Sequence, residues 1–498
     1  MGRLKIGWGR REISMEEPLS LFGQTYIRIS EGIMDPLYVT ALCLDGGEGQ
    51  DVAIFCTFDL ECVRCGLTEE TLEEVKKLCP EIPVDSIILG ATHTHTGGSI
   101  APTPEKSPDG ATIYSGDTYR AFVARQCAEA ICEAWTSRSE GGMSYGYGYA
   151  VVAHSRRVIY SEDMSAQSNN VAPNGHGVMY GNTAKESFSH YEAGADHFLN
   201  VMFTFNKEEK LTGMVINVPC PSQVAAGFSV QSSDYWAEVR ELVKREYGED
   251  VYVLPQCAAS GDLSPRILHY KKAQVRRMEL KYNMPYDYTD GQAYNKVMSE
   301  RMDIAERIVQ GVSEVYAWAK KDIQTNPTVR HQKRDLLLAR RTISEEEKVW
   351  CEENIERMKN AIPEEENCSP EEYRKAVSNY NTVRARNNTA LRRYGEQQEN
   401  PTFPTAVHAV RVGDVAFTTT RFELFMDYMH RIQARSPFVQ TFVIQLAGDE
   451  GGSYLSTERA TKNKGYSASL FCNHVSYEGG EQLVDQTLEM LEEMNDII

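Results

Sequence analysis

The fold is decided by the stretch Ile87-Ile88-Leu89-Gly90-Ala91-Thr92-His93-Thr94-His95-Thr96-Gly97-Gly98, in which an apolar run ends in two histidines and two glycines. Because side chains two apart on an extended segment point the same way, we expect His93 and His95 to face one cavity. The glycines would let the backbone approach whatever occupies that cavity. Two imidazoles so placed suit a metal ligand beside a proton-transfer group, or a pair of ligands. The alternative is two loop histidines capped by their threonines.

The residues before this stretch predict a strand, a helix and then the histidine strand. Apolar runs at 37–45 and 52–59 are typical of strands buried on both faces. Residues 67–79 predict a helix with acidic residues in its first turn, and prolines at 80 and 83 end it. This order is a βαβ unit, so we expect an α/β fold with a mixed sheet built from βαβ units and flanking helices.

The rest of the chain predicts further strands and helices, and one region, residues 270–400, differs in composition. Further strands are predicted at 141–153, 198–205, 211–218, 251–254, 406–412, 415–420 and 438–446. Residues 270–400 are charged and predict a helical layer or insertion, with helical periodicity over roughly 291–320, 343–361 and 370–395. Residues 161–195 are polar and predict a loop that serves as a lid. We expect one catalytic domain over 1–498, with the site where the loops after the strands at 87–92, 211–218, 251–254 and 441–446 converge.

The composition of the chain argues against some classes of binding partner. The chain has 498 residues and a formal net charge of −19, which argues against a nucleic-acid partner and against anionic membrane surfaces. Its 12 cysteines show no regular framework, and no apolar run is long enough to serve as a signal or to span a membrane. We therefore expect a cytoplasmic protein without membrane insertion that acts on a small molecule, with a homo-oligomer as the base-rate expectation.

Four further segments carry residues suited to chemistry. Gly261-Asp262-Leu263-Ser264-Pro265 places Ser264 after a glycine turn, where it suits a nucleophile or a contact to a substrate oxygen; the alternative is a helix N-cap. Glu423 lies in an apolar setting and must be paired, ligated or protonated, and a salt bridge to an arginine is the alternative. Arg156 can orient an anion or a carbonyl oxygen, or be structural. Tyr454 and Tyr466 lie twelve residues apart in a glycine-containing loop.

Taken together, the chain resembles the neutral (non-lysosomal) ceramidase family, amidases that cleave an N-acyl bond using zinc. The resemblance rests on segments in the family's order: Thr92-His93-Thr94-His95, Ser155-Arg156-Arg157, Gly261-Asp262-Leu263-Ser264-Pro265, Phe422-Glu423, and Tyr454 with Tyr466. It implies zinc ligands at His93, Glu423 and Tyr454. It implies four residues around the reacting centre: Ser264 as the catalytic serine, His95 as a proton-transfer or substrate group, Arg156 as the active-site arginine, and Tyr466 as the tyrosine that steadies the oxyanion.

One departure from the family concerns the metal. The family has a second zinc histidine at the strand end that here reads Val218-Pro219-Cys220-Pro221-Ser222, and Pro221 falls where that histidine would be. Three alternatives stay open: Cys220 serves as a soft ligand, His176 or His190 reaches in from the polar loop, or zinc is lost or replaced. We also expect neither the secretion signal nor the C-terminal immunoglobulin-like domain of the long family members.

The leading hypothesis is a ceramidase-like hydrolase that cleaves an amide or related acyl bond in a small polar substrate, assisted by zinc. The second is a zinc-independent enzyme that uses the same pocket on a sugar-like or other polar metabolite, with acid–base work by His95, Glu423 and a tyrosine. The third is a binding protein without catalysis.

Overall fold

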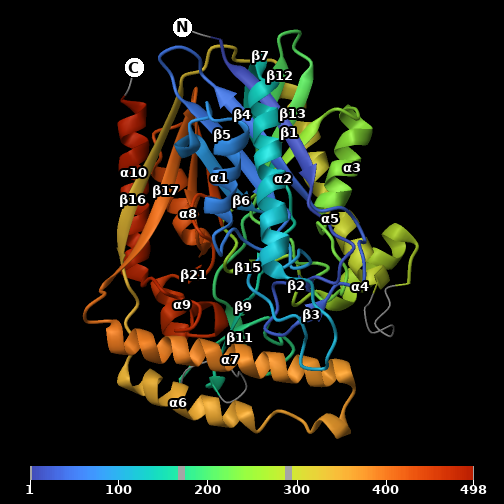
Figure 1. Cartoon of the computed structure of the whole chain (residues 1–498), viewed down its shortest axis with the longest axis vertical. Coiled ribbons are helices and arrows are strands. Elements are labelled where there is room, and N and C mark those ends of the chain that lie inside the picture. The colour runs from blue at the N-terminus through green and yellow to red at the C-terminus, as the bar shows by residue number, and fades with distance from the viewer. Residues whose placement is uncertain (1–2, 166–173, 286–293, 497–498) are drawn as a thin grey trace.

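A computed structural model describes residues 3–165, 174–285 and 294–496. Its frame is a large sheet whose eight strands lie in the order β14 (Tyr252–Cys257), β13 (Leu211–Val218), β12 (Phe198–Asn206), β7 (Ser139–Tyr149), β1 (Lys5–Glu12), β4 (Tyr38–Asp45), β5 (Val52–Phe58) and β6 (Ile87–Ala91). A four-stranded sheet has the order β16 (Val329–Ala339), β17 (Thr402–Val412), β18 (Val415–Thr420) and β20 (Gln440–Gln445). Figure 1 shows the two sheets in the upper part of the molecule.

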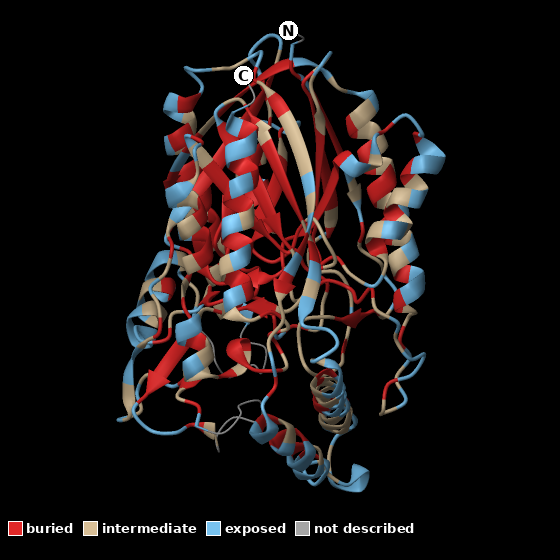
Figure 2. Ribbon diagram, turned by 90° about the vertical axis from the view of Figure 1, so that its left-hand side faces the viewer, coloured by how far each residue is buried: buried red, intermediate tan, exposed pale blue. Residues whose placement is uncertain are grey.

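The two sheets share a buried apolar core. The ring centroid of Phe417 in β18 lies 5.1 Å from that of Phe55 in β5 and 4.4 Å from that of Phe442 in β20. The same core includes side chains from both halves of the larger sheet, for example Leu44 and Val215. Burying this surface is the main favourable term for the fold. Figure 2 shows the buried strands enclosed by helices whose outer sides are exposed.

Helices cover the outer faces of both sheets. The larger sheet is covered by α1 (Leu67–Leu78), α2 (Gly116–Thr136), α3 (Trp236–Tyr247) and α5 (Tyr294–Ala319). The smaller sheet is covered by α8 (Met426–Arg435) and α10 (Tyr477–Asn495). In three pairs of parallel strands the chain passes from one strand to the other through a helix, namely β5-α1-β6, β13-α3-β14 and β18-α8-β20. The predicted mixed α/β fold with βαβ units is therefore confirmed.

A bend in the larger sheet brings distant strand ends together. Strands β1 and β7 pair through only two residue pairs, Lys5 with Glu140 and Ile6 with Ser139. The sheet forms a corner at this short pairing. The strands from β7 to β14 turn back there, so that β14 contacts β4, β5 and β6. The loops after β6 and β13 consequently meet, and Ser222 Oγ donates a hydrogen bond of 2.8 Å to the Thr92 carbonyl oxygen.

The predicted helical region at 270–400 differs from the structure in two respects. It contains α4 (Lys271–Tyr282), α5, α6 (Glu345–Lys359) and α7 (Pro370–Glu396), but also strand β16, which pairs with β17 along its whole length. The charged side chains of this edge strand hid the strand pattern. The helices do not form one layer either, because α5 packs on the sheet while α6 and α7 pack on each other and cross the lower end of the molecule (Figure 1).

The polar segment at 161–195 is also more regular than predicted. Residues 166–173 of it lie outside the described part of the chain. The remainder contributes β10 (Gly177–Met179) and β11 (Phe188–Tyr191), which flank β9 (Arg157–Tyr160) in a three-stranded sheet. Within the described parts of the chain, no helix is both long enough and apolar enough to cross a membrane.

Candidate active site

The histidine loop reaches a cavity by a different route from the one predicted. His93 follows β6 with a left-handed backbone (φ 62°) instead of an extended one. Both imidazoles nevertheless line the same cavity, with ring centroids 4.9 Å apart and planes near perpendicular. The glycines do not serve the cavity: a side chain at Gly98 would come within 2.6 Å of the Tyr119 ring, so glycine there lets the loop pack on α2.

The cavity has a volume of about 360 Å³ and collects residues from segments far apart in the sequence. It brings together six of the residues predicted from the sequence: His93, His95, Arg156, Glu423, Tyr454 and Tyr466. Arg156 lies between β8 (His154–Ser155) and β9. Glu423 and Tyr454 begin two short strands, β19 (Glu423–Leu424) and β21 (Tyr454–Leu455), which pair in parallel with these two residues side by side.

His93 and Glu423 form a buried pair of opposite charges. His93 Nδ1 lies 2.9 Å from the Glu61 carbonyl oxygen, which only accepts, so Nδ1 carries a proton. Nε2 lies 3.2 Å from Glu423 Oε2. Burial alone would lower the pKa of His93, but the negative charge of Glu423 leaves it raised. Burial alone would raise the pKa of Glu423, but His93 and Arg156 leave it lowered.

These two shifts predict how the pair's stabilisation depends on pH. Because the pKa of His93 is raised in the fold, the stabilisation from its charge is complete below pH 6.5 and is lost as the pH rises through this raised pKa. Because the pKa of Glu423 is lowered, the stabilisation from its charge is complete above pH 4.5. Thermal unfolding of wild type and His93→Gln in chelator-containing buffer should differ most between pH 4.5 and 6.5. A difference that stays constant well above pH 6.5 would show that His93 is not charged in the fold.

Arg156 is the most extensively bonded cation of the cavity. Its Nη2 donates to the Gly261 carbonyl oxygen at 2.8 Å and to Tyr454 Oη at 3.2 Å, and lies 3.5 Å from Glu423 Oε2. Its Nη1 donates to Tyr180 Oη at 3.3 Å. Arg156 is 1% exposed, and these partners hold its guanidinium in one orientation.

A hydrogen-bond chain assigns the protonation of His95. Arg156 Nη1 and the Tyr180 hydroxyl both direct hydrogens at Gln223 Oε1, so the Gln223 amide nitrogen faces His95 Nε2 at 2.9 Å. The amide donates, and His95 Nε2 therefore carries no proton, an assignment that follows from the network. Burial and the positive charge of His93 hold the pKa of His95 well below its usual value. His95 is the neutral imidazole of the site.

The two tyrosines present phenol groups to the cavity. Their ring centroids lie 6.1 Å apart. Burial and the nearby Glu423 carboxylate raise the pKa of Tyr454 well above its usual value, and burial also raises that of Tyr466. Tyr466 Oη accepts a hydrogen bond of 3.0 Å from Arg386 Nη2. Both phenols therefore keep their protons and can donate to an oxygen that enters the cavity.

Ser264 lies behind the cavity lining. It belongs to β15 (Leu263–Ser264), which pairs with β8, and it is 0% exposed. Its Oγ accepts a hydrogen bond of 3.1 Å from the Arg266 backbone nitrogen. The helix N-cap alternative does not hold, because α4 begins only at Lys271. The neighbouring Asp262 instead accepts a hydrogen bond of 3.1 Å from Met426 N at the start of α8.

Tyr180 connects Ser264 with the cavity, because it lines the cavity and its hydroxyl is hydrogen-bonded to Ser264. Burial alone would raise the pKa of Tyr180, but Arg156, Arg266 and the hydroxyl of Ser264 leave it lowered. Ser264 itself does not line the cavity. A direct attack by Ser264 on a substrate stays a prediction from the sequence.

The possible substitutes for the second zinc histidine lie elsewhere. Cys220 Sγ donates to the Val152 carbonyl oxygen at 3.4 Å, and burial raises the pKa of the thiol well above its usual value. His176 Nδ1 lies 3.1 Å from the Tyr160 carbonyl oxygen, and His190 lies on β11. None of the three lines the cavity. The strand-end segment contributes Gln223 there instead.

The residues present do not fit a zinc ion well. In favour of a metal, buried His93 Nε2 makes no hydrogen bond of good geometry in the described parts of the chain, although Glu423 Oε2 lies 3.2 Å away. Against it, none of the possible substitutes for the second zinc histidine lines the cavity. The oxygens of Glu423 and Tyr454 already face the permanently positive Arg156. One nitrogen, one carboxylate and one phenol make a poor zinc set.

Among the lining residues that were not predicted from the sequence, five bear on the charges and hydrogen bonds of the cavity. Tyr180 and Gln223 lie next to segments that were singled out, one in the polar segment and one just past Ser222. The others are Glu61, Arg266 and Arg386. Nothing local in the sequence marks Arg386, because it is one of many charged residues on the exposed helix α7.

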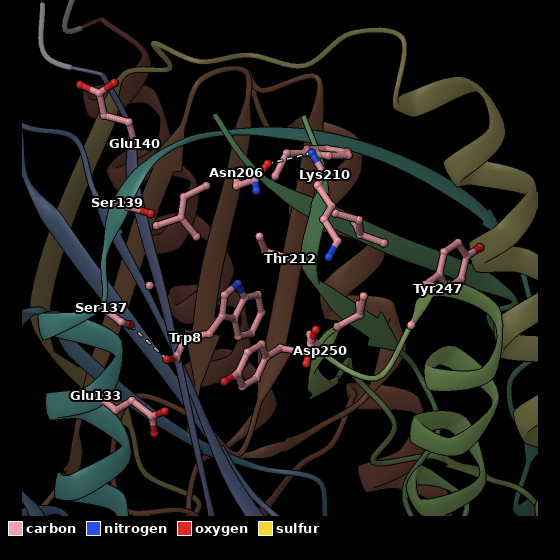
Figure 3. A pocket seen from close by; sticks show the side chains of 17 residues that line it. Trp8, Glu133, Ser137, Ser139, Glu140, Asn206, Lys210, Thr212, Tyr247 and Asp250 are labelled. Carbon is pink, nitrogen blue, oxygen red and sulfur yellow. Dashed lines mark hydrogen bonds between the residues drawn. The ribbon is translucent and has the colours of Figure 1, made fainter. Parts of the chain in front are cut away.

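A second cavity, of about 350 Å³, lies at the opposite strand ends, where β1 meets β13 and β14 (Figure 3). Trp8 and Asp250 are among its labelled side chains. Its described lining holds neither histidine nor arginine, and its Glu133 forms an ion pair with Arg11. We therefore place the candidate active site in the histidine cavity.

The architecture is that of an α/β protein with a polar, histidine-containing cavity at converging strand ends. No protein-family model and no curated protein sequence matches the chain. Its fold is that of the neutral ceramidases. The neutral ceramidase of Pseudomonas aeruginosa superposes with a TM-score of 0.66 at 13% identity, over 99% of this chain and 75% of that one. A ceramidase complexed with C2 gives 0.63 at 12% identity, over 99% and 76%.

Proposed function

We propose that the protein is a hydrolase that cleaves an amide or related acyl bond in a small polar substrate without zinc. The observation that carries the proposal is the meeting of three hydrogen-bond donors, Arg156, Tyr454 and Tyr466, with a neutral imidazole in one cavity. The likeness to neutral ceramidases supports the choice of an acyl bond. The cavity volume is near the lower end of the roughly 300–1,000 Å³ of ligand pockets, and its lining is polar, which favours a small polar substrate.

Each group has a distinct task in this reaction. The Arg156 guanidinium and the two phenols would donate hydrogen bonds to the carbonyl oxygen as negative charge develops on it. His95 would take a proton from water once the Gln223 amide releases Nε2, while the water oxygen bonds to the carbonyl carbon. His95 then returns that proton to the leaving amine or alcohol as the acyl bond breaks. The carboxylate of Glu423, which is also paired with His93, keeps Arg156 in place.

Metal content and turnover test the proposal together. We expect elemental analysis of the purified protein to find only substoichiometric zinc, unchanged in His93→Ala. Hydrolysis of a panel of N-acyl and O-acyl compounds, acylated sugars included, should be unaffected by a chelator. Stoichiometric zinc that disappears in His93→Ala, with activity lost on chelation and restored by zinc, would overturn the zinc-free mechanism. Stabilisation by compounds that are never turned over would instead indicate a binding protein.

A further inference from the structure

The geometry points to recognition of an anionic group on the substrate, a carboxylate or a phosphate, by Arg266 and Arg386. The inference deepens the proposed function, since it names the class of substrate. These arginines line the cavity but differ from Arg156, whose guanidinium is already bonded to protein oxygens.

Arg386 has a hydrogen-bonding group without a partner. The side chain reaches the cavity from α7, where its Nη2 donates to Tyr466 Oη. Its Nη1 is buried, and no acceptor for it exists in the parts of the chain that the structure describes. A buried guanidinium N–H without an acceptor is unfavourable, because it has lost water and gained nothing. An oxygen of a bound ligand would satisfy it.

The Arg266 side chain is also available to a ligand, but for a different reason. Its side chain is exposed, and the guanidinium carbon lies 5.5 Å from the centre of the Tyr180 ring. Among the described residues it makes neither an ion pair nor a hydrogen bond through its side chain. Its guanidinium therefore has its donors available, and a planar guanidinium matches the two oxygens of a carboxylate or phosphate.

The charge balance of the cavity favours the same ligand. The chain as a whole carries a formal charge of −19, yet this lining has three arginines against the two carboxylates of Glu61 and Glu423. Glu423 is already paired with His93 and faces Arg156. Two arginines then face one remaining carboxylate. A positive cavity in an acidic protein concentrates anions and repels cations.

Matched probes test the inference on the full chain. We would measure binding by calorimetry of N-acetylglycine, which carries a carboxylate, the O-phosphate of N-acetylethanolamine, and the neutral N-acetylglycinamide. We expect the wild type to bind at least one charged probe about tenfold or more tightly than the neutral one, because charge-assisted hydrogen bonds are the strong ones. Whichever charged probe binds more tightly distinguishes the carboxylate from the phosphate.

Substitutions test whether the two arginines themselves, and not the overall charge of the protein, bind the anionic group. Arg266→Gln and Arg386→Gln should each reduce the preference for the charged probe by about tenfold. Because Arg386 also holds Tyr466, Arg266→Gln is the cleaner test: among the described residues it removes no hydrogen bond or ion pair of the side chain, only the contact with the Tyr180 ring. Arg384→Gln, on the exposed side of the same helix α7, is the matched control and should leave the preference unchanged.

Three results would overturn the inference: no binding of either charged probe, equal binding of charged and neutral probes, or an effect of Arg384→Gln as large as that of Arg266→Gln. Acetate release from the same probes is measured in parallel. Charge-selective binding without release supports the anion site and contradicts the hydrolase, whereas release without charge selectivity does the reverse.

Discussion

Replacing Glu423 by Gln is expected to remove nearly all hydrolytic activity and to lower the free energy of unfolding by about 3–5 kcal/mol. Glu423 is 7% exposed and lies 3.2 Å from His93 Nε2 and 3.5 Å from Arg156 Nη2. The amide keeps the shape of the carboxylate but leaves two buried cations without their counterion. His93 would then lose its proton, and Arg156 would no longer be held toward the cavity.

Glu238→Gln is the matched control for this prediction. Glu238 is a similarly buried carboxylate, 2.9 Å from Arg301, in the contact between α3 and α5. We expect it to lower stability in urea unfolding while turnover per folded molecule stays at the wild-type level. If Glu423→Gln matched the wild type in both measurements, the buried ion pair would not exist in solution. If it lost stability but kept turnover, Glu423 would have no role in the reaction.

The second large effect is expected at a glycine. A side chain at Gly261 would place its Cβ 2.4 Å from the Glu423 carbonyl oxygen. Both backbones are fixed, since Gly261 N donates to Leu424 O at 2.8 Å and its own carbonyl oxygen accepts from Arg156. Gly261→Ala should therefore push β19 away and move Glu423, with a cost of roughly 1–3 kcal/mol in stability. A displacement of about 1 Å in a catalytic group costs on the order of 100-fold in rate.

Gly227→Ala separates this steric effect from the general effect of adding a methyl group. Gly227 is exposed, and an added Cβ would meet nothing within 4 Å. We expect kcat/KM and the unfolding temperature of this control to match the wild type. Equal behaviour of Gly261→Ala and Gly227→Ala would mean that the contact between Gly261 and β19 is loose in solution.

Local patterns predicted much of the fold. The apolar runs and prolines around residues 37–91 predicted two strands, α1 and β6, and all four are present. Helices α5, α6 and α7 were predicted within a few residues, because helical periodicity and capping are local properties. Strand β16 was missed because an edge strand carries charges on its exposed side, and its pairing with β17 is made across more than sixty intervening residues.

The candidate site, like the fold, was predicted in part from the sequence. Residue type and order along the chain are enough to indicate His93, His95, Arg156 and Glu423, and the cavity contains all of them. The two histidines meet for a different reason from the predicted one, because His93 has a left-handed backbone instead of an extended one.

What the sequence alone determined is the mixed α/β class and the chemical inventory of the site, because both depend on residue type and on periodicity along the chain. Tertiary structure alone decided which of those residues meet. The corner between β1 and β7 folds the larger sheet back on itself, so the loops after β6 and β13 join, and Gln223 reaches His95. It also decided that Ser264 lies outside the cavity lining and that α7 supplies Arg386. Such contacts depend on how whole elements pack, and no local pattern encodes them.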